Sequence, residues 1–238
     1  MEKLPFFYFK EHSSLDFGLY IADKGVYKGA KRDVTYTSVA GRSGDVIIDN
    51  GRYTNVKIPY KLALVNDTPH SFVELARLIR NWLLTDPGYF KLWDTYDKEY
   101  YRLASFSEEI NIEQQLSVYG KLDINFNCKP FRYLTSGQNK ITGSYNKLYN
   151  PEAYESEPYF KILGSGNCYV YVNGAQFSVK DVNGYVEVDS ELMSCHKGNT
   201  LLNNKMVGGF PKLKPGSNLI AAASNVTNIE IIPRWRTI

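Results

Sequence analysis

The sequence has few cysteines, no long apolar run and no obvious leader, and each absence excludes a class of protein. Cys128, Cys168 and Cys195 are odd in number, lie far apart and form no CxxC pair. This spacing argues against a disulfide framework and predicts buried or idle free thiols. No segment approaches the roughly 18 apolar residues of a membrane span, and the N-terminus lacks a signal-peptide core. We therefore expect a soluble chain, folded in a cytoplasm and not inserted in a membrane.

The chain also lacks a large excess of positive or negative charge. The 238 residues include 28 Lys and Arg against 25 Asp and Glu, and the formal net charge is +3. Nucleic-acid binding requires a basic patch or stripe, and the basic residues of this chain form no run. The composition therefore predicts no nucleic-acid partner.

Motifs for catalysis or cofactor binding are missing as well. Gly41–Val46 (GRSGDV) is not followed by the Lys-Ser/Thr pair of a phosphate loop, and Gly164–Gly166 (GSG) lacks the third glycine of a dinucleotide fingerprint. His12, His70 and His196 show no metal-ligand spacing, and no GxSxG nucleophile motif occurs. The sequence predicts no cofactor, no metal and no enzymatic activity.

Three carboxylates keep one enzymatic alternative open. Glu187, Asp189 and Glu191 alternate, so on a strand they would share one face. Glycoside hydrolases use two carboxylates on either side of the scissile bond. A solvated strand face is the simpler interpretation, and a glycoside hydrolase is a minor hypothesis.

The pattern that is present is mostly that of β-strands. Ser117–Lys129 alternates strictly between apolar and polar residues, which is typical of a sheet with one wet face. Leu4–Lys10, Lys31–Val39, Tyr89–Trp93 and Tyr100–Phe106 are predicted strands. Asp49–Arg52 contains Asn-Gly between two strand-like runs, which predicts a hairpin turn because both residues tolerate positive φ.

One helix is predicted, over about residues 69–84. Thr68 is the expected cap, and Pro69 suits the first helical turn. Apolar residues follow at helical spacing on one face: Phe72, Leu75, Ala76, Ile79 and Leu83. Asp86-Pro87-Gly88 should end the helix.

A change of composition after about residue 133 predicts two domains. Leu134–Asn150 is rich in Ser, Thr, Gly and Asn, and short strands with Gly/Asn turns follow it, including a hairpin at Asn173-Gly174. We expect a mainly β chain with two β-sandwich-like domains. The first (1–133) carries the helix, and the second (134–238) is a sandwich or jelly roll. Which domain holds Ile229–Ile238 is left open.

Tyrosines on the predicted strands of the second domain suggest a binding surface. Tyr169 and Tyr171 share one strand face, and Tyr185 lies on a nearby strand. Such a row could stack on sugar rings or bury against a protein partner, or it could belong to the core of the sandwich. A carbohydrate-binding module is therefore the alternative function.

Five segments together resemble the distal tail protein (Dit) family of long-tailed, non-contractile phages and their prophages. In the first half, these are VAGRSGDVIIDNGRYTNVKIPYKL (Val39–Leu62) and SFVELARLIRNWLLTDPGYFKLWDTYDKEYYRLA (Ser71–Ala104). In the second half, they are LYNPEAYESEPYFKILGSG (Leu148–Gly166), VNGAQFSVKDVNGYVEVDSELMSCHKG (Val172–Gly198) and FPKLKPGSNLI (Phe210–Ile220). The resemblance covers nearly the whole chain.

The resemblance implies a virion structural protein of the phage tail tip or baseplate. Its first domain would form a homo-hexameric ring, and its second would be a galectin-like β-sandwich. The ring would join the tail tube protein to a tail-associated lysin, fibre or receptor-binding protein. Extended family members carry an inserted carbohydrate module, and its absence here argues against sugar binding.

The ring interface is predicted from the strand and turn character of two short segments and from the resemblance. A ring requires two different faces of each subunit to meet, and unpaired strand edges are a ready means for this. The predicted interface residues are Arg42, Ser43, Gly44, Asp45, Val46, Asp49, Asn50, Gly51 and Arg52.

Overall fold

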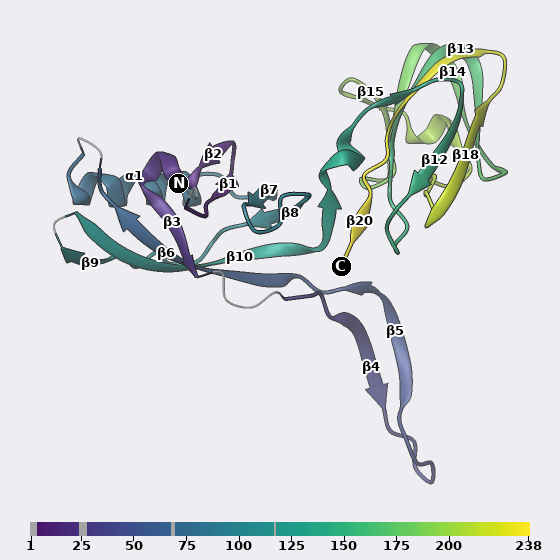
Figure 1. Cartoon of the computed structure of the whole chain (residues 1–238). Coiled ribbons are helices and arrows are strands. Elements are labelled where there is room, and N and C mark those ends of the chain that lie inside the picture. The colour runs from purple at the N-terminus through teal and green to yellow at the C-terminus, as the bar shows by residue number, and fades with distance from the viewer. Residues whose placement is uncertain (1–3, 24–27, 68–69, 117) are drawn as a thin grey trace. The chain divides into compact units, whose positions relative to one another are not determined.

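The computed structural model describes residues 4–23, 28–67, 70–116 and 118–238, and its contacts divide the chain into two compact units. Unit 1 is Met1–Arg132 with Ile238, and unit 2 is Tyr133–Thr237. Each unit has its own sheet (Figure 1). Each unit also has its own apolar core.

The main sheet of unit 1 has the strand order β2-β1-β7-β8-β10-β6-β3, and β9 also pairs with β10. The strands are β1 (Phe7–Phe9), β2 (His12–Ser13), β3 (Leu19–Asp23), β6 (Val56–Val65), β7 (Phe90–Asp94), β8 (Tyr100–Ser105), β9 (Glu113–Leu116) and β10 (Tyr119–Leu134). The last strand of the chain, β20 (Arg236–Thr237), falls within the range of unit 2. The centre of this sheet is the antiparallel pair of β6 and β10, in register from Tyr119↔Val65 to Cys128↔Val56.

Strict alternation along β10 confirms the predicted half-buried strand. Leu122, Ile124 and Phe126 are buried, and the residues between them are more exposed. The partner strand β6 alternates in the same way, so both strands turn one apolar face to the core. Ser117, where the prediction began this strand, lies outside the described residues.

Helix α1 (Phe72–Leu84) begins later than predicted. Ser71 is its N-cap, and it forms a capping box with Glu74 in which each side chain accepts from the other residue's backbone N–H. This box satisfies two amide groups that the first turn leaves unpaired. The predicted cap and first residue, Thr68 and Pro69, lie outside the described residues.

The helix packs one apolar face into the core of unit 1. Leu75, Ile79 and Leu83 are fully buried, as their spacing predicted. Trp82 lies beside them, stacks on Phe17 at 4.5 Å between ring centroids and donates from Nε1 to a β1 carbonyl at 3.0 Å. This bond satisfies the polar atom of a ring that is otherwise buried.

A separate two-stranded sheet in unit 1 consists of β4 (Arg32–Thr37) and β5 (Val46–Tyr53) (Figure 1). Here the predicted hairpin turn is wrong. Asn50 and Gly51 lie inside β5, and the chain reverses over residues 38–45 instead. Gly51 does have the expected positive φ, 70°, but the residue belongs to a β-bulge and not to a turn.

The sheet of unit 2 has the order β11-β19-β13-β14-β15-β16, with β12, β17 and β18 attached to the side. The strands are β11 (Ile141–Thr142), β12 (Tyr145–Asn150), β13 (Tyr159–Val172), β14 (Ala175–Asp189), β15 (Ser194–Lys197), β16 (Thr200–Leu201), β17 (Met206–Val207), β18 (Gly216–Ala222) and β19 (Val226–Ile232). The sheet is built around the long β13–β14 hairpin (Figure 1).

The predicted turn at Asn173-Gly174 is confirmed. These two residues join β13 to β14 with φ of 53° and 85°. Two successive positive φ values are those of a type I′ turn, whose twist matches that of the flanking strands.

Strand β13 changes partner half-way, and a glycine makes this possible. Its first half pairs with β19, and its last residues pair with β18 on the same edge. At the change-over, a Cβ on Gly164 would lie 2.6 Å from the carbonyl oxygen of Asn225. The backbones can approach this closely only where no side chain intervenes.

The observed architecture confirms the predicted fold class: the chain is mainly β, with one α-helix in its described part. Three short 3-10 segments complete the described elements: η1 (Ser14–Phe17), η2 (Thr135–Gln138) and η3 (Asn203–Lys205). None of the helices in the described ranges is long and apolar enough to cross a membrane.

Candidate functional site

The nine predicted interface residues lie together on the β4–β5 hairpin. Arg42–Asp45 form part of the connection between the strands, and the other five belong to β5. All are exposed except Val46, which is half-buried. The structure thus brings the two predicted segments into one element, although no partner chain is present to contact them.

Two arginine–aspartate pairs hold the bulge of this hairpin. Arg32 pairs with Asp49, with Nε at 3.2 Å from Oδ2, and its Nη1 donates to the hydroxyl of Tyr53 at 2.9 Å. Across the strands, Nε of Arg52 donates to Asp33 at 2.6 Å. The bulge is therefore fixed by side chains that cross from one strand to the other.

Hydrogen bonds lower the pKa of both carboxylates of the bulge. The Asn50 amide, followed by Arg52, lowers the pKa of Asp33 below its ordinary value. The Arg32 guanidinium, followed by the backbone N–H of Gly51, does the same for the pKa of Asp49. These charges are on the surface, so their role is to hold shape more than to add stability.

The hairpin also exposes large apolar side chains. Tyr36 and Ile47 are opposite each other in the register and are each 62% exposed. Ile48, on the other face, is 51% exposed. Both faces of this sheet therefore present apolar area to solvent, which is unusual for a surface with no partner.

The three candidate tyrosines of unit 2 do not form one row. Tyr169 and Tyr171 are exposed on one face of β13, while Val170 between them is buried. Tyr169 pairs with Ser178, which lies seven residues before Tyr185 on β14, a path of roughly 20 Å. A single sugar ring could not contact all three.

Tyr185 has a different environment from the other two tyrosines. Its half-buried ring has the ammonium groups of Lys161 and Lys197 at 4.8 Å and 5.0 Å from its centroid. Cations at this distance are attracted by the ring quadrupole. The ring is thus already engaged by cations of its own unit.

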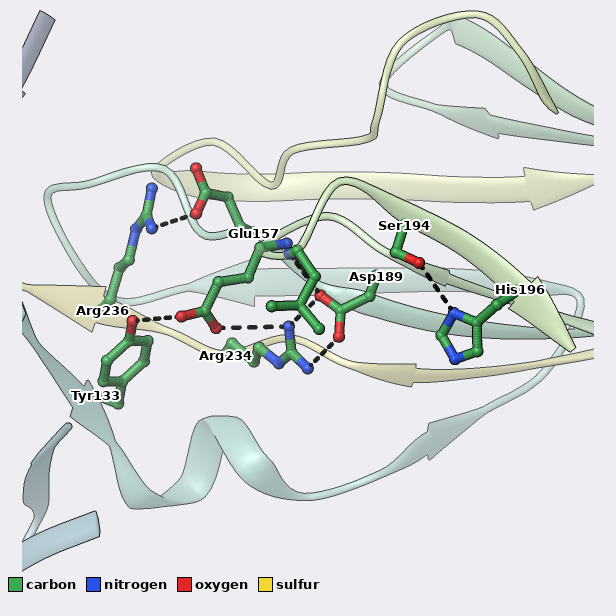
Figure 2. Close-up of polar contacts among 9 residues, drawn as sticks. Tyr133, Glu157, Asp189, Ser194, His196, Arg234 and Arg236 are labelled. Carbon is green, nitrogen blue, oxygen red and sulfur yellow. Dashed lines mark hydrogen bonds and ion pairs between the residues drawn. The ribbon is translucent and has the colours of Figure 1, made fainter. Parts of the chain in front are cut away.

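Two of the three alternating carboxylates, Asp189 at the end of β14 and Glu191 just beyond it, are bound by an arginine that the sequence analysis did not single out. Arg234 donates from Nη1 and Nη2 to the two oxygens of Asp189, at 2.7 Å and 2.8 Å (Figure 2). Its Nη1 is also 3.5 Å from Glu191, which accepts from the Tyr133 hydroxyl at 3.1 Å. Arg234 comes from the chain after β19 and has a φ of 54°, which no sequence motif signals.

This environment gives neither Asp189 nor Glu187 the raised pKa of a general acid. Burial alone would raise the pKa of Asp189, but the bonds from Arg234 lower it below its ordinary value. Burial would also raise the pKa of Glu187. Hydrogen bonds from the Tyr159 hydroxyl, at 2.5 Å, and from the backbone N–H of Gly198 lower it instead. A general acid needs a raised pKa, and both carboxylates are instead held ionised.

The histidines and cysteines are dispersed. His196 is 3.7 Å from Glu187 and its Nδ1 is 3.4 Å from the Ser194 hydroxyl (Figure 2). The three thiols are buried and free, as expected, and burial raises the pKa of Cys195 to about 11. Within the described ranges, no three His, Cys, Asp or Glu side chains gather as a metal site would require.

Sequence comparison and structure comparison give different outcomes. No protein-family model matches the chain, and no curated protein matches it in sequence. Among solved structures, it is similar to the Dit protein (gp 19.1) of phage SPP1, with a TM-score of 0.70 over 96% of this chain and 98% of that one. The chain has the Dit fold.

The two Dit-fold chains are 13% identical, so the likeness lies in the arrangement of elements and not in the residues. The SPP1 protein is described as a hub of the adsorption apparatus of phages that infect Gram-positive bacteria. The predicted resemblance to this family is confirmed at the level of fold, over both units.

Proposed function

We propose that the chain is a structural hub protein of a phage tail tip, without enzymatic activity. The proposal rests on one observation. The structural similarity to the SPP1 hub protein covers 96% of this chain and 98% of the SPP1 protein. The lowered pKa values of Glu187 and Asp189 support the absence of glycosidase chemistry.

The hub would be a homo-hexameric ring that joins the tail tube to tip and host-adsorption proteins. The exposed β4–β5 hairpin supports this, because its apolar side chains and unpaired strand edges need a partner to cover them. Arg42–Val46 and Asp49–Arg52 are the proposed contact segments. Closure into a ring requires the hairpin to meet a different surface of the next subunit.

The first test is the solution mass, measured by light scattering on a sizing column over a range of protein concentrations. Six copies of the 27.2 kDa chain would have a mass of about 163 kDa. A mass near that value, with ring-shaped particles by negative stain, supports the hub. A chain that remains monomeric both alone and with tail tube protein would contradict it.

The hairpin's part in assembly is tested by removing its apolar side chains. Tyr36→Ser with Ile47→Ser takes away two side chains that are each 62% exposed. The double variant should lower the assembled mass while the chain stays folded, with an unchanged circular dichroism spectrum. Val73→Ser is the matched control, because Val73 is an exposed apolar residue, 77% accessible, on α1.

The exposed pair Tyr169 and Tyr171 favours a second candidate, binding to host cell-wall polysaccharide. Their rings are 36% and 38% exposed and share one strand face, so adjacent sugar rings could stack on them. Tyr171→Ala should then weaken binding to purified cell walls in a pull-down assay, with Tyr149→Ala, another exposed tyrosine, as control. Equal binding by both variants would remove this candidate.

A further inference from the structure

Unit 2 contains a pocket of about 210 Å³ between β14 and the chain from Lys197 to Lys205, and all of its lining residues belong to that unit. Val182, Tyr185 and Leu202 contribute apolar side chains to its wall. A cavity of about 150 Å³ is large enough to hold a benzene molecule. This pocket can therefore accept a ligand the size of a six-membered ring.

A β-bulge in β14 shapes one side of the pocket. Where the register of β13 and β14 shifts, Lys180 and Asp181 of β14 stand opposite a single residue of β13, Asn167. Asp181 has a φ of 51°, and its backbone N–H donates to Oδ1 of Asn167 at 3.3 Å. Bulges redirect side chains and are frequent beside functional sites. Here the bulge brings a cation and a carboxylate to the pocket.

The charged residues of the lining leave an excess of positive charge. Three lysines, Lys180, Lys197 and Lys205, face one carboxylate, Asp181, which gives a net charge of +2. Asp181 is 3.6 Å from Lys205, and its own side chain is 76% exposed. Neither Lys180 nor Lys197 has an ion-pair partner in the described part of the chain. Like charges that lie close together favour an anion between them.

The charges just outside the lining do not remove this excess. Lys161, whose ammonium group is 4.8 Å from the centroid of the Tyr185 ring, is opposite Glu187 in the register of β13 and β14. These two side chains carry opposite charges. Glu187 also accepts from the Tyr159 hydroxyl and from the backbone N–H of Gly198, so its oxygens are bound to other donors.

The ammonium group of Lys197 lies at the wall of the pocket. Its Nζ donates to the carbonyl of Asn183 at 2.5 Å and is 5.0 Å from the centroid of the Tyr185 ring. Both of these partners belong to the lining. An ammonium group has three N–H donors, so two remain for a ligand.

We propose that this pocket binds a phosphate monoester of a small sugar or polyol. The phosphate accepts from Lys197 and Lys205, and the sugar or polyol lies against Val182 and Leu202. Lysine binds phosphate as a point charge, whereas a planar carboxylate is matched better by arginine, which does not occur in the lining. A phosphate monoester carries about two negative charges at neutral pH, which matches the excess of the lining. The site is independent of the hub proposal, because no lining residue belongs to the β4–β5 hairpin.

The test uses glucose 6-phosphate, glucose 6-sulfate and glucose, which share a ring and differ in charge. Each is titrated into the full chain at physiological ionic strength and followed by NMR chemical shifts. Glucose 6-phosphate should bind saturably and about tenfold more tightly than the singly charged sulfate, and glucose should bind most weakly. Equal binding of phosphate and sulfate, or no saturation by the phosphate at millimolar concentrations, would overturn the proposal.

Variants assign the binding to the pocket. Lys197→Gln should weaken binding of glucose 6-phosphate about tenfold, as expected for the loss of a charge-assisted hydrogen bond. Lys147→Gln, at an exposed position of β12 outside the lining, is the matched control and should leave the affinity unchanged. If Lys197→Gln does not fold, Lys205→Gln replaces it, with the same expectation. An equal loss in Lys147→Gln would mean attraction to the overall charge of the chain and would contradict a site here.

An acidic peptide distinguishes a small phosphate ester from a segment of a partner protein. A hexapeptide of alternating Asp and Glu is titrated under the same conditions. Weaker binding than that of glucose 6-phosphate supports the proposal. Tighter binding that is lost in Lys197→Gln would assign the pocket to an acidic protein segment instead, and the phosphate proposal would be wrong.

Discussion

Two Arg–Asp pairs with similar chemistry lie in very different surroundings. Arg234 and Asp189 in unit 2 have side chains that are 19% and 7% exposed. Arg32 and Asp49 in the β4–β5 hairpin have side chains that are 52% and 42% exposed. The first pair is mostly buried within unit 2. The second pair lies on the surface and joins the two strands of the hairpin.

The difference follows from what surrounds each pair. Removing one partner of a buried pair leaves a charge that water cannot reach, whereas an exposed charge is solvated and screened. The same contrast holds for apolar residues, because Val170 and Val172 of β13 are buried while Ile47 and Ile48 of β5 are not. Unit 2 is thus stabilised from within, and the hairpin presents a surface that a partner would cover.

The largest effect should come from breaking the buried pair. Arg234→Gln leaves Asp189 charged and without its two guanidinium bonds, and should lower the free energy of unfolding of unit 2 by about 3 kcal/mol. Chemical denaturation followed by circular dichroism measures this. Lys140→Gln, which breaks the exposed pair with Glu230, is the control and should have little effect. Equal losses in both variants would show that burial does not distinguish the pairs.

Lowering the pH should cause a smaller and gradual loss of the stability that the Arg234–Asp189 pair contributes. The pKa of Asp189 is lowered in the folded chain, so its stabilising contribution is complete above the unfolded value of about 3.9. The contribution is lost as the pH falls through the lower folded pKa. In Arg234→Gln, burial alone acts on Asp189 and raises its pKa, so the buried charge is neutralised there at a higher pH than in the wild type. The stability difference between the wild type and Arg234→Gln should therefore shrink as the pH falls through this raised pKa and on through the lowered pKa of the wild type. A difference independent of pH would exclude ionised Asp189 as its source.

A still smaller, local effect is expected at the bulge of the hairpin. Gly51 has a φ of 70°, which L-residues rarely adopt, and no atom lies within 4 Å of the position that a Cβ would take. The strain in Gly51→Ala is therefore in the backbone conformation and not in a clash with neighbouring residues. The left-handed conformation should weaken β4–β5 pairing by about 1 kcal/mol. Amide hydrogen exchange should quicken in this hairpin alone. Quicker exchange throughout unit 1 would mean that the hairpin is coupled to the main sheet.

The smallest effect is predicted for the exposed pair itself. Arg32→Gln removes the contacts to Asp49 and Tyr53, yet both of those groups remain solvated. The unfolding temperature should not change, while cross-strand NMR contacts across the bulge should weaken. A large drop in unfolding temperature would place the hairpin in the folding unit of the main sheet.

Two identical dipeptides show where local sequence is enough and where it is not. Asn173-Gly174 forms the turn that its residues favour, and Asn50-Gly51 takes positive φ at its glycine without forming a turn. In β5, the chain continues because Asp33 accepts from both Asn50 and Arg52 across the strands. The backbone preference of Asn-Gly is set by the dipeptide itself. Whether it forms a turn or a bulge depends on how the flanking strands pair.

The candidate sites show the same limit. The nine interface residues were predicted as two segments, and pairing of β4 with β5 joins them on one hairpin. The tyrosines were predicted as one surface, but pairing of β13 with β14 separates Tyr185 from the other two. Arg234 was not singled out at all, because its importance depends on lying beside Asp189, 45 residues earlier.

The amino-acid sequence by itself determined the β-rich class, the alternation of β10, the apolar face of α1 and the turn at Asn173-Gly174, because these follow from side-chain spacing and backbone preference within a few residues. Tertiary structure decided which carboxylates are paired with arginines and which apolar side chains stay exposed. Those properties depend on desolvation and on contacts between residues far apart in the chain, which local patterns do not encode.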